Sequence, residues 1–263
     1  MTKTVNPNGI QIAYKERGSG KPIVLLHGFC GSSAYWDDLV PLLEKDFRVI
    51  TPDLRGHGHS SVPDQPYTME NMAEDIRGLC ESLQLQAPVL LGHSLGGYVT
   101  LAFAERYPDY LIGFGLIHST GLPDDETAKS NRSKGIEQIK EKSIQPFIDN
   151  LIPKLFAPGH LNSMKAQVDK AKQIGLSTAP EGAIHTLEGM RDRKDRTSVI
   201  MTTNKPVLLV AGSEDQVISP DKVFSADEQL VKAELIEGAG HMSMYEAPDK
   251  LAEIIRSFVN PAL

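Results

Sequence analysis

Short apolar runs alternate along the chain with longer stretches in which apolar residues recur every three or four positions. The short runs are bounded by Gly, Pro or charged residues and rich in Val, Ile and Leu, which is typical of buried strands. We place such strands at 22–26, 47–51, 88–91, 111–117, 206–210 and 233–236. Helical spacing is found at 35–43, 69–83, 95–106, 220–230 and 247–258. This alternation predicts an α/β fold with a mostly parallel sheet and helices on both of its faces.

The N-terminal segment has a different pattern. Asn8-Gly9 lies between Thr4-Val5 and the alternating run at 10–14, which is the strongest short-range signal of a β-hairpin. Two antiparallel strands at the start bring the predicted sheet to about eight strands.

One interval, 121–197, contains no strand-like run. Its helical stretches, at 136–144, 148–156 and 164–174, are rich in Lys, Gln and Glu. We therefore divide the chain into a core made of 1–120 and 198–263 and a helical insertion at 121–197. Ligands of open α/β sheets bind at the carboxyl ends of the strands, so we expect the insertion to form a lid there.

The composition and charge argue against some classes of partner but do not identify a reaction. The 263 residues are 40% hydrophobic and 23% charged, as in ordinary globular proteins. A net charge of −7 without a basic run predicts no nucleic-acid partner and no membrane partner. The chain has two cysteines, Cys30 and Cys80, and no apolar signal segment at its start, so we expect a cytoplasmic protein.

The clearest chemical motif is Gly92-His93-Ser94-Leu95-Gly96. It lies between a predicted strand and a predicted helix, where a Gly-x-Ser-x-Gly run forms a sharp turn that exposes the serine hydroxyl. Glycine two residues on either side of the serine leaves room for the crossing of strand and helix. Ser94 is therefore the candidate nucleophile, and a glycine-rich structural turn is the alternative.

The run Leu-Gly-His-Ser-Leu-Gly-Gly-Tyr at 91–98 resembles the nucleophile turn of α/β-hydrolase fold proteins, in particular lid-bearing esterases and cofactor-free haloperoxidases. The resemblance extends over 9–258 and weakens across the insertion. It implies the α/β-hydrolase fold and acyl-transfer chemistry. Relatives that dehalogenate alkanes or open epoxides carry aspartate at this position, and Ser94 argues against both activities.

The loop after strand 22–26 reads His-Gly-Phe-Cys-Gly at 27–31 and is similar to the family's oxyanion loop. The resemblance implies that the backbone N–H groups of Phe29 and Leu95 bind the oxyanion. We interpret His27 as a residue that ties down this loop and not as the base. A reactive thiol at Cys30 stays open, although no basic residue adjoins it in the sequence.

A second polar run, Asp-Leu-Arg-Gly-His-Gly-His-Ser, occupies 53–60. His57 and His59 are potential metal ligands, but a zinc site needs three or four ligands and no partner cluster is near in sequence. We predict no metal, and we interpret Asp53 and Arg55 as an internal ion pair or loop anchor.

His241 is the candidate base, because it follows the last predicted strand and precedes the last helix. The order nucleophile, acid, histidine is the one expected for this fold. The acid should follow strand 206–210, where Glu214 and Asp215 are neighbours, and the resemblance favours Asp215.

Together these residues predict a serine hydrolase that needs no cofactor and cleaves carboxylic esters of small to medium acyl chains. A carbon–carbon bond hydrolase or lyase and a perhydrolase are the main alternatives, and a non-catalytic ligand receptor is a third. The expected partner is a small acyl substrate, and a homo-oligomer stays open.

Overall fold

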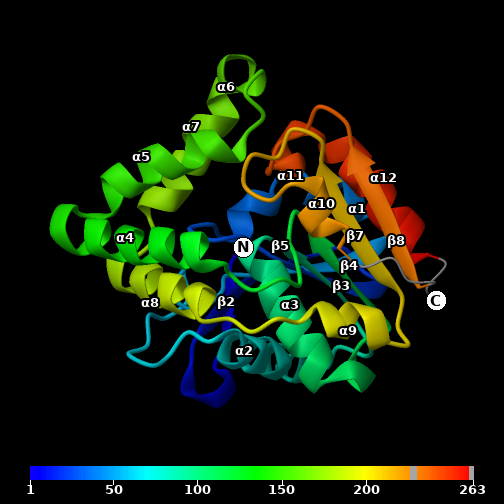
Figure 1. Cartoon of the computed structure of the whole chain (residues 1–263). Helices are drawn as coiled ribbons and strands as arrows, with labels where there is room; N and C mark the ends of the chain where they lie inside the picture. Colours follow the sequence, from blue (N-terminus) through cyan, green and yellow to red (C-terminus); the bar gives the residue numbers. More distant parts are fainter. Residues whose placement is uncertain (226–229, 261–263) are drawn as a thin grey trace.

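A computed structural model describes residues 1–225 and 230–260 and has an eight-stranded sheet at its centre (Figure 1). The strand order is β1-β2-β4-β3-β5-β6-β7-β8. The strands are β1 (Lys3–Val5), β2 (Ile12–Arg17), β3 (Lys21–Leu26), β4 (Phe47–Pro52), β5 (Val89–His93), β6 (Gly113–Ile117), β7 (Val207–Gly212) and β8 (Val231–Ile236). β2 runs antiparallel to β1 and β4, and all other neighbours are parallel. The mostly parallel sheet predicted from the sequence is confirmed.

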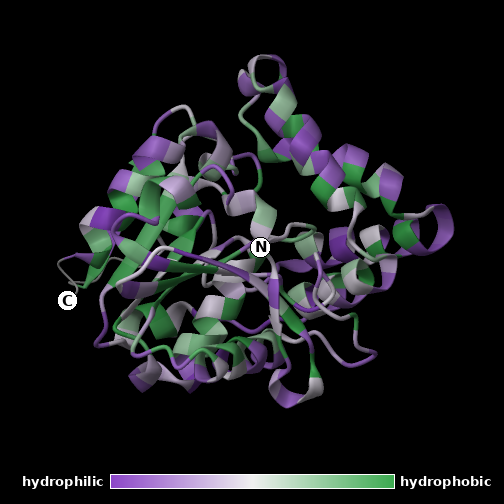
Figure 2. Cartoon of the chain, turned by 180° about the vertical axis from the view of Figure 1, so that it is seen from behind, coloured by the Kyte–Doolittle hydropathy of each residue, from purple (hydrophilic) through white to green (hydrophobic). Residues whose placement is uncertain are grey.

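Helices cover both faces of this sheet (Figure 1). On one face α2 (Met69–Ser82), α3 (Leu95–Arg106) and α9 (Thr197–Thr202) pack together, and α3 rests on β5 and β6. On the other face α1 (Val40–Leu43) packs with α12 (Pro248–Val259). The central strands β5, β6 and β7 are fully buried and largely apolar, as the green strands at the centre of Figure 2 show, because this part of the parallel sheet is covered on both sides.

The register brings the carboxyl ends of the parallel strands to one edge. Leu26 pairs with Gly92, and Ile117 pairs with both His93 and Val210. At the next strand Gly212 pairs with Ile236. The loops that follow β3, β5, β6, β7 and β8 therefore begin near one another.

A group of helices lies between β6 and α9 in the sequence. It consists of α4 (Glu126–Lys142), α5 (Ile144–Leu155), the short α6 (His160–Ser163), α7 (Lys165–Leu176) and α8 (Pro180–Arg191). The predicted helices at 136–144, 148–156 and 164–174 are present, but α4 begins ten residues earlier and α8 was missed. The first part of α4 is polar, and the helix starts where the Asp125 carboxylate accepts a hydrogen bond from the Ala128 N–H (2.8 Å). Apolar periodicity alone does not detect such a start.

The single helix predicted at 35–43 is wrong. The structure has a 3₁₀ turn at Ser33–Trp36 and the separate helix α1. Pro41 has no N–H to offer the carbonyl of Asp37, and its ring would clash with that carbonyl in a regular helix, which disfavours a continuous helix over 35–43.

Two other predictions need correction. The helix predicted at 220–230 is only α10 (Pro220–Val223) in the described part, and 226–229 lie outside the described residues. β1 and β2 pair as predicted, but the connection is a 3₁₀ turn at Pro7–Gly9 within a longer loop, not a two-residue hairpin turn. Asn8 and Gly9 still adopt positive φ, of 52° and 79°. In the described residues, no helix combines the length and the apolar character that crossing a bilayer requires.

The loop after β4 is held by buried charges. The Asp53 carboxylate accepts hydrogen bonds from the N–H groups of Ser33 (2.6 Å) and His59 (2.9 Å). Arg55 forms a two-point ion pair with Asp75 of α2, at 2.6 and 2.7 Å. Asp53 is thus a loop anchor, whereas the ion pair of Arg55 is with Asp75 and not with Asp53.

The Arg55–Asp75 pair should be a large contributor to stability when only one partner is removed. Asp75→Ala should lower the free energy of unfolding by about 3–5 kcal/mol, because it leaves a buried guanidinium uncompensated. The matched control is Asp169→Ala, which breaks the exposed pair Lys165–Asp169 and should cost under about 1 kcal/mol. Urea denaturation measures both changes, and similar small losses in the two variants would show that the buried pair carries no special weight.

Candidate active site

Ser94 occupies the turn between β5 and α3 in an unusual backbone conformation. Its φ is 50° and its ψ is −113°, the conformation of the first central residue in a type II′ turn. Glycine adopts this region freely, whereas a side chain is strained there. In this strained conformation Ser94 directly precedes the first residue of α3 and lines a cavity.

The glycines around Ser94 are required by close contacts. A Cβ on Gly92 would lie 2.1 Å from the carbonyl oxygen of Gly96, and a Cβ on Gly96 would lie 2.5 Å from that of Leu26. A Cβ on Gly97 would lie 2.3 Å from Ser119 Oγ. Strand, turn and helix therefore cross at a separation that only glycine permits, which explains the Gly-x-Ser-x-Gly pattern.

His241 and Asp215 are brought together from the loops after β8 and β7. The Nδ1–H of His241 donates to Asp215 Oδ2 at 2.7 Å, and both side chains are almost completely buried. The other carboxylate oxygen, Oδ1, accepts the N–H groups of Val217 (2.8 Å) and Ile218 (3.0 Å). Burial by itself raises the pKa of Asp215, but attraction to His241, the hydrogen bond from His241 and the polar contact with His118 outweigh it and hold this pKa far below its ordinary value. The carboxylate is therefore ionised and fixed in orientation.

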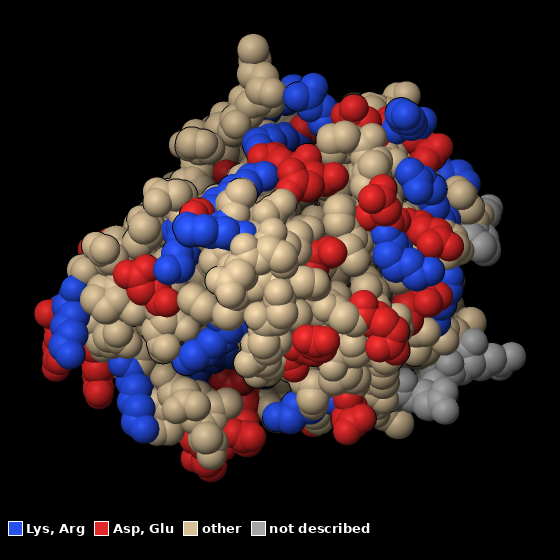
Figure 3. Space-filling model, turned by 90° about the horizontal axis from the view of Figure 1, so that it is seen from above, with Lys and Arg blue, Asp and Glu red and all other residues tan. Residues whose placement is uncertain are grey.

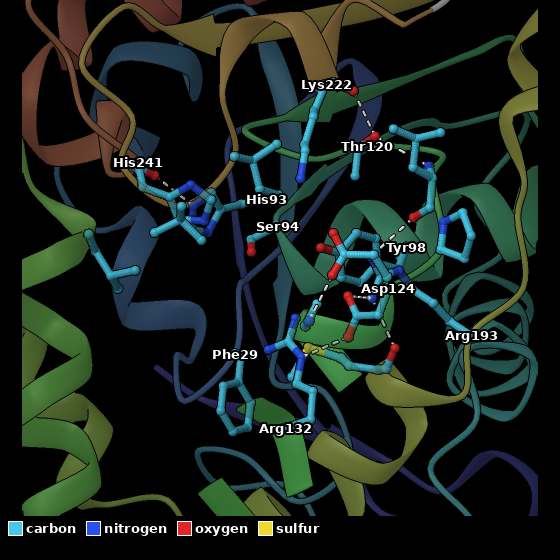
Figure 4. A pocket seen from close by; sticks show the side chains of 18 of the residues that line it. Phe29, His93, Ser94, Tyr98, Thr120, Asp124, Arg132, Arg193, Lys222 and His241 are labelled. Atoms are coloured by element: carbon cyan, nitrogen blue, oxygen red, sulfur yellow. Dashed lines mark hydrogen bonds and ion pairs between the residues drawn. The ribbon is translucent and has the colours of Figure 1, made fainter. Parts of the chain in front are cut away.

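Because Nδ1 of His241 is bonded to Asp215, its Nε2 atom is available to bind a group in the cavity. Ser94 and His241 both line one cavity of about 410 Å³ (Figure 4). No hydrogen bond joins Ser94 Oγ to His241 within the described residues, as is common for such pairs before substrate binds. The structure thus brings together all three residues that the sequence singled out.

Glu246 positions the loop that carries His241. Its Oε2 accepts the N–H groups of Gly240 (2.9 Å) and Met242 (3.1 Å), one on each side of the histidine. Its Oε1 accepts the N–H of Ala157 (2.7 Å) and lies 2.9 Å from His160 Nδ1. The N–H of His241 itself donates to the carbonyl of Leu155 at 2.7 Å. The loop is therefore tied to the end of α5. We did not assign Glu246 a role from the sequence, although it follows the histidine closely.

The loop after β3 lies directly against Ser94. A Cβ on Gly28 would be 3.4 Å from the Cβ of Ser94. His27 ties this loop down, since its Nε2 accepts the Leu54 N–H at 2.9 Å and its Nδ1 lies 2.8 Å from the carbonyl of Gly28. Burial lowers the pKa of His27, so its ring is neutral.

The predicted oxyanion donors are the N–H groups of Phe29 and Leu95. Leu95 is the first residue of α3, where a helix leaves its N–H groups without intrahelical partners. Neither amide donates to an acceptor in the described part of the chain. Both residues adjoin the loop and turn that meet at Ser94, so their N–H groups are available to a bound oxygen atom.

Two further histidines lie beside the Asp215–His241 pair. His118 follows β6 directly; its Nδ1 is 3.3 Å from Asp215 Oδ2, and its Nε2 is 2.7 Å from Ser243 Oγ. His93 lies 2.8 Å, through Nε2, from the carbonyl of His241. Burial lowers the pKa of both rings. The signal for His118 in the sequence is its position as a polar residue directly after a buried strand.

His118, Asp215 and His241 also form the one cluster of three potential metal ligands within residues 1–225 and 230–260, with ligand atoms within 4.8 Å of one another. Two of these atoms, His241 Nδ1 and Asp215 Oδ2, already share a hydrogen bond, which a metal would have to replace. The donor set therefore fits a hydrogen-bonded pair better than a metal site. His57 lies 3.0 Å, through Nδ1, from the carbonyl of Arg55 and belongs to no such cluster in the described residues.

Cys30 belongs to the loop after β3 and is fully buried, and burial raises the pKa of its thiol far above the ordinary range. The thiolate form is therefore suppressed, which argues against the reactive thiol left open by the sequence.

The chain is similar to known proteins in both sequence and fold. A family model described as "alpha/beta hydrolase fold" matches residues 21–248. A thermophilic esterase from Thermogutta terrifontis, solved with malate bound, is 31% identical; the match covers 100% of this chain and 99% of that one, with a TM-score of 0.94. Lipase 1 from Psychrobacter immobilis is 28% identical over 95% of this chain and 81% of the lipase. A bromoperoxidase from Bacillus anthracis, 23% identical over 98% of this chain and 99% of its own, shares the fold with a TM-score of 0.88.

The strained conformation of Ser94 leads to a stability prediction that is independent of catalysis. Ser94→Gly should be more stable to unfolding than Ser94→Ala by about 1 kcal/mol or more, because glycine adopts the positive φ without strain. This gain should exceed the loss from the greater freedom of glycine in the unfolded chain. Thermal or urea unfolding of the two variants measures the difference. A Ser94→Ala protein that is equally or more stable would contradict the strain.

Proposed function

Because the chain belongs to the α/β-hydrolase fold family, we propose that it is a carboxylesterase that forms an acyl-enzyme on Ser94. The observation that carries this proposal is the convergence of Ser94, at a strained strand-to-helix turn, and the buried His241–Asp215 pair on one cavity. The esterase and lipase relatives support a hydrolase of ester bonds.

In the proposed mechanism His241 Nε2 removes the proton of the Ser94 hydroxyl as the oxygen attacks the ester carbonyl. Asp215 holds the imidazole in the tautomer that leaves Nε2 free, and stabilises the imidazolium that forms. The carbonyl oxygen gains negative charge, which the N–H groups of Phe29 and Leu95 stabilise. Collapse expels the alcohol with the proton from His241, and a water activated by the same histidine then hydrolyses the acyl-enzyme.

We further propose that 121–197 acts as a cap over the core formed by 1–120 and 198–263. Three contributions of this segment support that role: Leu122 and Arg132 line the cavity, and the carbonyl of Leu155 binds the His241 N–H. A covered cavity of about 410 Å³ suits esters of small to medium acyl chains.

Removal of the nucleophile is the primary test. Ser94→Ala should reduce kcat for a soluble butyrate ester at least about a thousandfold, because no acyl-enzyme can form. Circular dichroism confirms that the variant is folded. Retention of a tenth of the wild-type rate would refute the assignment of Ser94.

The choice between two neighbouring acids gives a second test. Asp215→Asn should lower kcat by about two decades or more, because the amide favours the wrong imidazole tautomer. Glu214 is exposed, so Glu214→Gln should keep most of the activity and serves as the matched control. A severe loss in Glu214→Gln beside a mild loss in Asp215→Asn would reverse the assignment of the acid while leaving Ser94 and His241 in place.

A further inference from the structure

The cavity that contains Ser94 has cationic side chains in otherwise largely apolar walls. Lys222 comes from α10, Arg132 from α4, and Arg193 from the segment after α8. Figure 4 shows Lys222 and Arg132 directed toward the cavity from opposite sides of Ser94 in that view. Apolar lining residues include Phe29, Leu151, Leu155, Met190 and Val217.

Of these three cations, Lys222 has the fewest hydrogen-bond and ion-pair partners among the described residues. Its backbone carbonyl accepts the Thr120 hydroxyl at 2.7 Å, which fixes the start of the side chain. Its ammonium group makes no ion pair or hydrogen bond with any residue that the structure describes. Lys222 is an exposed residue, and it also borders the cavity that Ser94 lines. An ammonium in that position is a donor available to a bound anion.

Arg132 also has unused donors. Its Nε donates to Asp124 Oδ2 at 3.1 Å, and its two terminal nitrogens have no partner among the described residues. Asp124 is shared with Arg193, whose guanidinium also donates to the carbonyls of Leu122 (3.0 Å) and Met190 (2.9 Å). The Asp124 carboxylate therefore binds two guanidinium groups, and the two terminal nitrogens of Arg132 remain available to bind a ligand.

The charge balance of the lining favours a ligand with one negative charge. Arg132, Arg193 and Lys222 face two acids, Asp124 and Asp125, and the Asp125 carboxylate is occupied in capping α4. Counted over the lining residues alone, the cations exceed the acids by one. The chain as a whole carries −7, and acidic and basic side chains are interspersed on the face shown in Figure 3, so the excess of one positive charge among the lining residues has the opposite sign to the net charge of the chain. A carboxylate matches it, whereas a phosphate monoester dianion would overcompensate it.

We propose that the ester cleaved at Ser94 carries a carboxylate group, which Lys222 and Arg132 bind while the ester carbonyl lies at the serine. This inference rests on the proposed esterase function and names the substrate class for it. The carboxylate can belong to the acyl part, as in a monoester of a short dicarboxylic acid, or to the alcohol part, as in an acylated hydroxy acid.

Two matched substrate pairs distinguish these cases. Monomethyl succinate, with the charge on the acyl side, is compared with the neutral methyl succinamate. Acetoxyacetate, with the charge on the alcohol side, is compared with acetoxyacetamide. For at least one pair, kcat/KM of wild-type enzyme should be ten times or more higher for the charged ester, since a charge-assisted hydrogen bond commonly contributes that much. The pair that shows the preference identifies the side.

Substitutions of Lys222 and Arg132 test whether these residues cause the preference for the charged ester. In Lys222→Met the ratio of charged to neutral kcat/KM should fall at least tenfold, and in Arg132→Met it should fall at least threefold. Lys21→Met is the control: Lys21 is exposed at the start of β3, outside the cavity, and its loss changes the net charge equally. The control should keep the wild-type ratio.

Direct binding separates failure of the subsite from failure of the esterase proposal. Calorimetric titration should show that succinate binds to Ser94→Ala protein, that succinamide does not, and that the added substitution Lys222→Met weakens succinate binding at least tenfold. Equal turnover of charged and neutral esters together with no succinate binding would overturn the carboxylate site and leave the serine esterase intact. Succinate binding that depends on Lys222, without turnover of any ester, would uphold the site and overturn the esterase.

Discussion

The close crossing of β5, the Ser94 turn and α3 is the constraint on which the rest of the site depends. The carbonyl oxygens of Gly96 and Leu26 lie where side chains at positions 92 and 96 would be, so the helix starts immediately over the sheet. The same crossing forces Ser94 to positive φ and leaves the Leu95 N–H at the free end of a helix. One steric requirement therefore places Ser94 at the helix terminus and leaves beside it an N–H group that, as we propose, binds the oxyanion.

Buried hydrogen bonds then fix the groups that face Ser94. Asp215 accepts bonds at both carboxylate oxygens, and Glu246 accepts bonds from the backbone on both sides of His241. Each of these acids would be costly to bury without such partners, and with them each one orients a loop. His241, the proposed base, is thus held by two carboxylates, one bound to its ring and one bound to the backbone on either side of it. The second carboxylate also connects this loop to the segment after α5.

The parallel sheet and the three central side chains could be predicted because their signals are local. Apolar runs mark buried strands, and Gly92, Ser94 and Gly96 encode the crossing in five consecutive positions. The family membership confirms the resemblance inferred from this motif. Elements whose ends are set by single residues are harder to predict from apolar periodicity: Pro41 divides an apolar stretch that reads as one helix, and the polar start of α4 shows no apolar face. The roles of His118, Glu246 and the Lys222–Arg132 pair arise from residues far apart in sequence, which no local spacing connects.

Covalent labelling is the most direct test of the proposal that Ser94 is the nucleophile activated by His241 and Asp215. A fluorophosphonate should add once to the native protein, and mass spectrometry of the digested product should place the adduct on Ser94. Labelling should be lost in His241→Ala, because without the base the hydroxyl is not activated. An adduct on another residue, or ester hydrolysis that continues at the wild-type rate after complete labelling of Ser94, would contradict the account.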